Sequence, residues 1–138
     1  MTNLSKHLLE SEVSSITIGL TFVSINTYSV SVPAMNSVVR FGTAVEISQN
    51  NAVGLEIDSF VQQYDGLPLL ASTCGDRIVS LDISDRHLEL RFARGVSITA
   101  KWQPDEEGCV QIDSAGGPED DAAAIMLTLP DDIGQVQQ

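Results

Sequence analysis

The chain has 138 residues, a hydrophobic fraction of 43% and a formal net charge of -12, from 19 acidic and 7 basic residues. This length is enough for a core of its own, so we expect one domain over 1–138 with a flexible tail at 131–138. The acidic balance argues against nucleic acid and anionic membranes as partners, because dense Lys and Arg bind both. The apolar runs fall far short of the roughly 20 residues that span a bilayer. The start has no pattern of a secretory signal, so we expect a cytoplasmic protein.

The N-terminal region predicts one short helix and then a strand. Residues 3–12 can form a helix with Leu4 and Leu8 on its inner side and His7 at the surface. From Ile16 to Phe22 apolar and polar residues alternate with the two-residue period of a strand.

A turn is expected at 24–26, and more alternating stretches follow it. Asn50 and Asn51 predict another turn, because asparagine tolerates left-handed backbone. The strands predicted in this part of the chain cover 28–32, 39–41, 45–47 and 53–57.

Residues 58–75 lose the alternation and predict a short helical connector. Phe60 and Tyr64 stand four residues apart behind Asp58, a residue that caps helices. Pro68 is suited to the first turn of a second helix, where its missing N–H costs nothing.

Residues 76–102 predict a three-stranded meander. Apolar residues alternate with polar ones over 79–83, 88–92 and 96–102. Asp85 and Arg86 fit a two-residue turn, and Gly95 fits the positive φ of a three-residue loop. These turn lengths fix a register in which every apolar residue meets an apolar partner. The predicted pairs are Val79 with Phe92, Leu81 with Leu90, Ile83 with Leu88, Phe92 with Val96, Leu90 with Ile98 and Leu88 with Ala100.

The C-terminal region predicts a strand at 110–112 and an ambiguous segment at 122–129. Its three alanines favour a helix, whereas Ile125, Leu127 and Leu129 alternate up to Pro130 and favour a strand, which we choose. In sum the fold class is mainly β (α+β). We expect an antiparallel curved sheet or sandwich of about eight short strands with one or two short helices.

Candidate catalytic and metal-binding residues are sparse. Cys74 and Cys109 are expected to be reduced, partly buried thiols, although a disulfide between them is possible in principle. His87 is interpreted as a turn residue, and a Cys–His catalytic pair stays an open alternative. Asp82 and Glu89 face each other in the predicted register, but basic neighbours indicate a surface charge lattice. We therefore expect no catalytic site, metal or cofactor.

A short apolar segment that ends at Gly75, followed by 77–80, 88–92, Gly95 and 97–98, resembles a strand module of small uncharacterised bacterial proteins. Some of these are immunity proteins of toxin systems. The resemblance implies a non-enzymatic protein that occludes a basic protein partner such as a toxin. The acidic composition agrees with this, because it favours charge-steered association. The expected partner-binding residues are Asp105, Glu106, Glu107, Asp113, Glu119, Asp120 and Asp121.

Two other classes remain open from the sequence. One is a small-ligand-binding or enzymatic domain with a pocket inside the curved sheet, lined by Tyr28, Tyr64, His87 or Cys74. The other is a structural subunit that forms a homodimer through an exposed strand edge.

Overall fold

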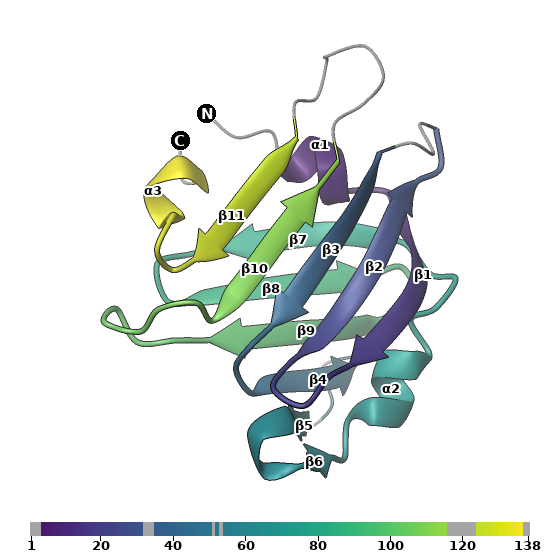
Figure 1. Ribbon diagram of the computed structural model, residues 1–138. Helices are drawn as coiled ribbons and strands as arrows, with labels where there is room; N and C mark the ends of the chain where they lie inside the picture. The colour runs from purple at the N-terminus through teal and green to yellow at the C-terminus, as the bar shows by residue number, and fades with distance from the viewer. Residues whose placement is uncertain (1–3, 32–34, 51, 53, 116–123, 137–138) are drawn as a thin grey trace.

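The computed structural model describes residues 4–31, 35–50, 52, 54–115 and 124–136. These residues form two antiparallel β-sheets that pack as a sandwich and do not close into a barrel (Figure 1). The predicted β-rich class is confirmed, with eleven strands where the sequence indicated about eight.

The first sheet has five strands in the order β1-β2-β3-β10-β11. Neighbouring strands pair antiparallel throughout. The strands are β1 Ser11–Ile18, β2 Val23–Ser29, β3 Asn36–Phe41, β10 Val110–Ser114 and β11 Ile125–Leu129.

The second sheet has six strands in the order β6-β5-β4-β9-β8-β7, and Figure 1 shows them crossing behind the first sheet. The predicted meander forms one half of this sheet. Its strands are β4 Val45–Gln49, β5 Leu55–Asp58, β6 Gln63–Tyr64, β7 Ile78–Ile83, β8 His87–Phe92 and β9 Val96–Lys101.

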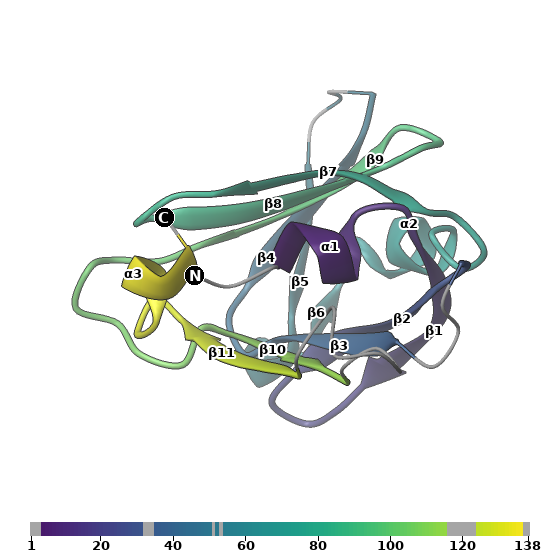
Figure 2. The same ribbon diagram turned by 90° about the horizontal axis from the view of Figure 1, so that it is seen from above.

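Three short helices and one 3-10 turn complete the described fold. They are α1 Leu4–Leu8, η1 Ser59–Val61, α2 Leu67–Ala71 and α3 Ile133–Val136. Figure 2 shows α1 between the two sheets, at one open end of the sandwich. The predicted Asp58 cap is confirmed, because its Oδ1 accepts the Phe60 N–H at 3.0 Å.

The core lies between the two inner sheet faces. In β8, β9 and β10 buried side chains alternate with more exposed neighbours, so each sheet contributes one buried face. The most completely buried members include Ile25, Val39 and Ile112 of the first sheet and Ile47, Leu90 and Ile98 of the second.

The predicted N-terminal helix is too long. It stops at Leu8 because Glu10 adopts a φ of 65° and its N–H donates to the Ile78 carbonyl at 2.7 Å, which joins the chain to β7. The next residue, Ser11, already begins β1.

The turn predicted at 24–26 is also wrong, because these residues lie inside β2. The chain reverses earlier, where the Gly19 N–H donates to the Phe22 carbonyl at 2.8 Å. A Cβ at Gly19 would lie 2.3 Å from the Phe22 ring, so glycine allows the ring to fold over this turn. The alternation through Leu20 therefore continues past the end of the strand.

The meander register is confirmed at most positions. Leu81 pairs with Leu90 and Leu90 with Ile98, and the Ser84 N–H closes the two-residue turn on the His87 carbonyl at 2.9 Å. The prediction fails at Val79, because a bulge between Ile78 and Ser80 sets Ile78 opposite Phe92. The bulge turns Ile78 into the core and leaves Val79 exposed.

The strand chosen for the last ambiguous segment is confirmed as β11. The tail expected over 131–138 instead contains α3, and its Ile133 and Val136 pack against the core. Of the described helices, none combines the length and apolar character needed to cross a membrane.

Candidate partner-binding site

Three of the predicted contact residues lie together in the loop between β9 and β10. Asp131, which follows β11, joins them, because its Oδ1 accepts the Gly108 N–H at 3.0 Å. The two segments surround a hollow of about 420 Å³, and its lining residues are two prolines and four acids. We call the four acids the acidic corner: Asp105, Glu106, Glu107 and Asp131.

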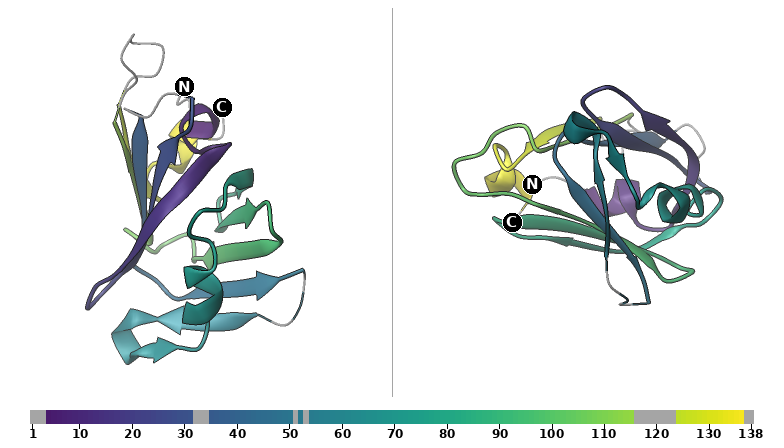
Figure 3. Two further views of the ribbon diagram at one scale, coloured as in Figure 1. Left: turned by 90° about the vertical axis from the view of Figure 1, so that its right-hand side faces the viewer. Right: turned by 90° about the horizontal axis from the view of Figure 1, so that it is seen from below.

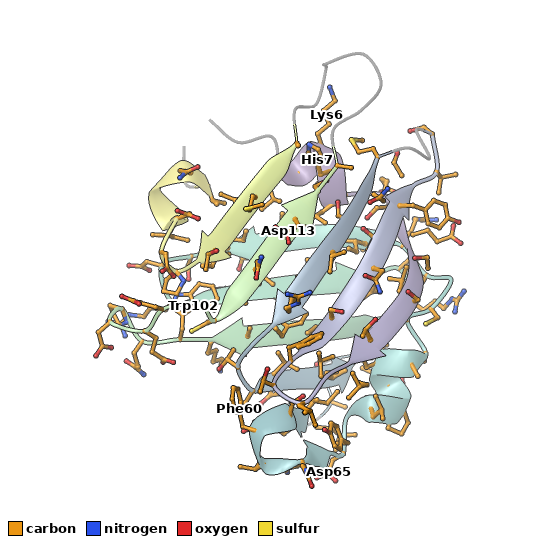
Figure 4. All side chains as sticks on the ribbon, viewed as in Figure 1. Lys6, His7, Phe60, Asp65, Trp102 and Asp113 are labelled. Carbon is orange, nitrogen blue, oxygen red and sulfur yellow. The ribbon has the colours of Figure 1, made fainter. Side chains whose placement is uncertain are left out.

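The loop that carries the acidic corner is anchored at its start by Trp102. This side chain is buried, and its Nε1 donates to the Asp85 carbonyl at 2.8 Å (labelled in Figure 4). Beyond it, the Gln103 N–H donates to Glu106 Oε1 at 2.8 Å, and the Glu106 N–H donates to the Gln103 carbonyl at 3.0 Å. These reciprocal bonds fix the loop and hold the carboxylates in solvent.

The negative charge of the acidic corner acts on Cys109. Burial, followed by the carboxylates of Glu106 and Asp131, raises the pKa of this thiol to about 11. The thiol lies 3.7 Å from Glu106 Oε2. Cys109 is a buried free thiol and Cys74 an exposed one, so the expectation of partly buried thiols holds for Cys109 alone.

The remaining predicted contact residues do not join the acidic corner. Asp113 lies on β10 among outward residues, because Ile112 and Ser114 on either side of it face the core. It is placed between Val38 and Met126 in the first sheet. Figure 4 shows it away from Trp102. Glu119, Asp120 and Asp121 fall outside the described residues.

His87 lies in a hydrogen-bonded row with a serine and an aspartate. Its Nδ1 contacts Ser84 Oγ at 2.7 Å, and its Nε2 contacts Asp82 Oδ2 at 3.0 Å. Ser84 Oγ also accepts the Arg86 N–H at 3.2 Å, so the same hydroxyl closes the β7–β8 turn. We therefore interpret these hydrogen bonds as part of the structure of the β7–β8 turn.

The predicted charge lattice is present beside it. Asp82 and Glu89 pair across β7 and β8 as expected. Arg91 forms its ion pair with Glu89, with its Nε 2.9 Å from Oε1, whereas Asp82 is engaged by His87.

The prediction that His7 lies at the surface is wrong. The side chain is 1% exposed, and its Nδ1 contacts Ser114 Oγ on the inner face of the first sheet. Ser37 Oγ donates to the same Ser114 oxygen at 2.8 Å. The signal available in the sequence was spacing, since His7 follows Leu4 by three residues and so shares its helix face.

The four residues proposed to line an internal pocket lie apart. Tyr28 is on β2, Tyr64 on β6, Cys74 after α2 and His87 at the start of β8. The pKa of Tyr28 is raised, chiefly by the neighbouring carboxylate of Glu12. A hollow of about 610 Å³ lies beside α1 and β1, and none of the four lines it.

At one sheet edge, the backbone groups of Thr128 are bound by Asp132. Asp132 Oδ2 accepts the Thr128 N–H at 2.8 Å, and the Asp132 N–H donates to the Thr128 carbonyl at 2.7 Å. These bonds occupy outward backbone groups of β11, which is how proteins restrain pairing between edges.

The described part of the chain contains no group of three or more His, Cys, Asp or Glu side chains placed to hold a metal ion. No known protein family, curated protein or solved structure matches the chain.

Proposed function

We propose that the protein is a non-enzymatic binding protein that docks a basic protein partner, as an inhibitor or immunity protein does. The observation that carries this proposal is the acidic corner. Two segments more than twenty residues apart in the sequence, 104–107 and 130–131, converge there on a hollow lined by four acids. The overall charge of -12 has the same sign and extends the attraction beyond the site.

The acidic corner suits fast capture of a cationic surface. The backbone of its β9–β10 loop is held by hydrogen bonds between Gln103 and Glu106, so little backbone entropy is lost when a partner binds. Exposed charges of this kind act mainly on the association rate and on specificity. Binding should therefore weaken as salt screens the attraction.

The first partner to test is the product of the adjoining gene, because immunity proteins are encoded next to their toxins. We expect a basic protein whose association rate falls as salt rises. The charge reversal D105K/E107K should lower that rate at least tenfold at low ionic strength. The matched control E10K/E12K makes the same change in net charge at the start of β1, at residues that do not line this hollow. Equal effects of the two double variants, or binding independent of salt, would overturn the proposed site, and no complex at all would overturn the immunity assignment.

A further inference from the structure

Three large apolar side chains are displayed to solvent at one end of the sandwich. Leu20 is 87% exposed, Phe60 63% and Val61 66%. Leu20 lies in the turn between β1 and β2, and the other two lie in η1. We call these three residues the apolar end.

The two turns come from different sheets but lie side by side. Figure 1 places the β1–β2 turn next to η1 at the lower end of the molecule, and both views of Figure 3 agree. Phe60 is labelled at this end in Figure 4. Leu20 and Phe60 stand forty positions apart in the sequence, so the fold brings them to the same patch.

Local hydrogen bonds hold both turns in shape. Beside Leu20, the Phe22 ring folds over Gly19 and supports the Arg40 guanidinium, which lies 4.6 Å from the ring centre. In η1, Asp58 caps the Phe60 N–H, and the Gln62 N–H donates to the Ser59 carbonyl at 3.3 Å. The apolar side chains are thus presented by ordered backbone.

The chain around η1 is acidic. The charged residues nearest to η1 along the chain are Glu56, Asp58 and Asp65, and no Lys or Arg lies between Arg40 and Arg77. Asp65 lies at the same end as Phe60 (Figure 4). Arg40, the nearest basic residue before this stretch, stacks on Phe22. An apolar centre with an acidic border is complementary to a surface with apolar anchors among basic residues.

We propose that the apolar end is a docking surface for a cationic amphipathic segment of another protein. The proposal rests on the proposed function for the sign of the partner's charge, and adds where the apolar anchors of that partner bind. Leu20 and Phe60 are the residues expected to dominate, because large side chains at the centre of an interface carry most of its energy.

The test uses a synthetic amphipathic helix made of leucine and lysine, with two comparison peptides. One replaces leucine by serine and keeps the charge, and the other replaces lysine by glutamate. Binding is measured by calorimetry and mapped by amide chemical shifts. We expect the leucine–lysine peptide to shift Leu20, Phe60 and Val61, and the other two to leave them unmoved.

The variant L20S/F60S should weaken binding of the leucine–lysine peptide at least tenfold. Its control is M126S, because Met126 is 76% exposed but lies on β11 in the first sheet. This control should change the affinity less than twofold, and the melting temperature of each variant verifies that it is folded. D105K/E107K should leave the shifts at the apolar end in place, so failure of the acidic corner is distinguished from failure of this surface.

Three results would overturn the proposal. The peptide could bind L20S/F60S as tightly as the unchanged protein. The glutamate peptide could bind as well as the lysine one. Finally, light scattering could show a dimer that L20S/F60S dissolves, in which case the occupant is a second copy of this chain.

Discussion

Asp76 connects three parts of the fold, and removing its carboxylate should destabilise the protein strongly. The residue is 5% exposed. Its Oδ1 accepts the Arg77 N–H at 2.9 Å and its Oδ2 accepts the Arg94 N–H at 3.0 Å. Its own backbone carbonyl accepts the Val13 N–H at 2.9 Å. The start of β7, the β8–β9 turn and β1 therefore meet at one residue.

The expected cost of Asp76→Ala follows from these bonds. Each hydrogen bond to a charged acceptor contributes about 1.5–3 kcal/mol, and the substitution leaves two backbone donors unsatisfied. The loss should be about 3–5 kcal/mol, a large part of the roughly 5–15 kcal/mol that stabilises a domain. Asp76→Asn keeps one acceptor oxygen and should lose about half as much.

The assay is guanidinium denaturation followed by the fluorescence of Trp102, the single and buried tryptophan. The matched control is Asp82→Ala, because this carboxylate is 64% exposed and its ion pair with His87 is a surface one. It should lose less than about 1 kcal/mol. A free energy of unfolding lowered no more by Asp76→Ala than by Asp82→Ala would contradict this role of the buried carboxylate.

Three further predictions concern buried polar groups. Ser114→Ala removes the hydroxyl that both His7 and Ser37 contact, and should lower the free energy of unfolding by about 2 kcal/mol. It should also reduce amide-exchange protection in α1, and unchanged protection would contradict the role of this contact. Thr27→Val should stabilise by about 1 kcal/mol, since its buried Oγ1 has no hydrogen-bond partner among the residues that the structure describes. Thr73→Val should destabilise, since the Thr73 Oγ1 donates to the Leu70 carbonyl at 2.6 Å; melting shifts of the same sign would refute this contrast. With its pKa raised to about 11, Cys109 should be thiolate in about one molecule in a thousand at pH 8. In the variant Cys74→Ser, alkylation of Cys109 by iodoacetamide should therefore become about tenfold faster per pH unit. Glu106→Gln should speed this reaction, and mass spectrometry measures both rates.

The strands could be predicted from the sequence wherever both the period and the turns were visible. Leu81, Leu90 and Ile98 stand in the predicted row because a one-residue slip would expose every apolar side chain of the meander. At Val79 the same pattern failed. A bulge depends on tertiary bonds, here between Ile78 and Glu10, and such bonds leave no trace in local alternation.

The β1–β2 turn shows how an exposed turn residue can continue the alternation of a strand in the sequence. Leu20 fits the alternation of β1, so the sequence indicated a core residue, although the side chain is displayed to solvent. Gly19 was the local signal for a turn, and its meaning depends on the Phe22 ring above it.

The acidic corner was predicted in part. Asp105, Glu106 and Glu107 are neighbours in the sequence, so composition was sufficient to find them. Asp131 joins them through Gly108, a contact between residues separated by 23 positions that only the pairing of β10 with β11 creates. Asp113 lies only six residues beyond Glu107, but the strand carries it away from the corner onto an outward sheet face.

The acidic corner and the apolar end should affect different steps of binding to one basic partner. Charges in an exposed loop act at a distance and steer the encounter, so D105K/E107K should mainly lower the association rate, most of all at low salt. Apolar contacts form only once the surfaces meet, so L20S/F60S should mainly raise the dissociation rate. The effects on binding free energy should add in the combined variant, because distant sites without shared contacts behave independently. Stopped-flow mixing at two salt concentrations separates the two rates. If L20S/F60S slows association as strongly as D105K/E107K does, this division between steering and anchoring is wrong.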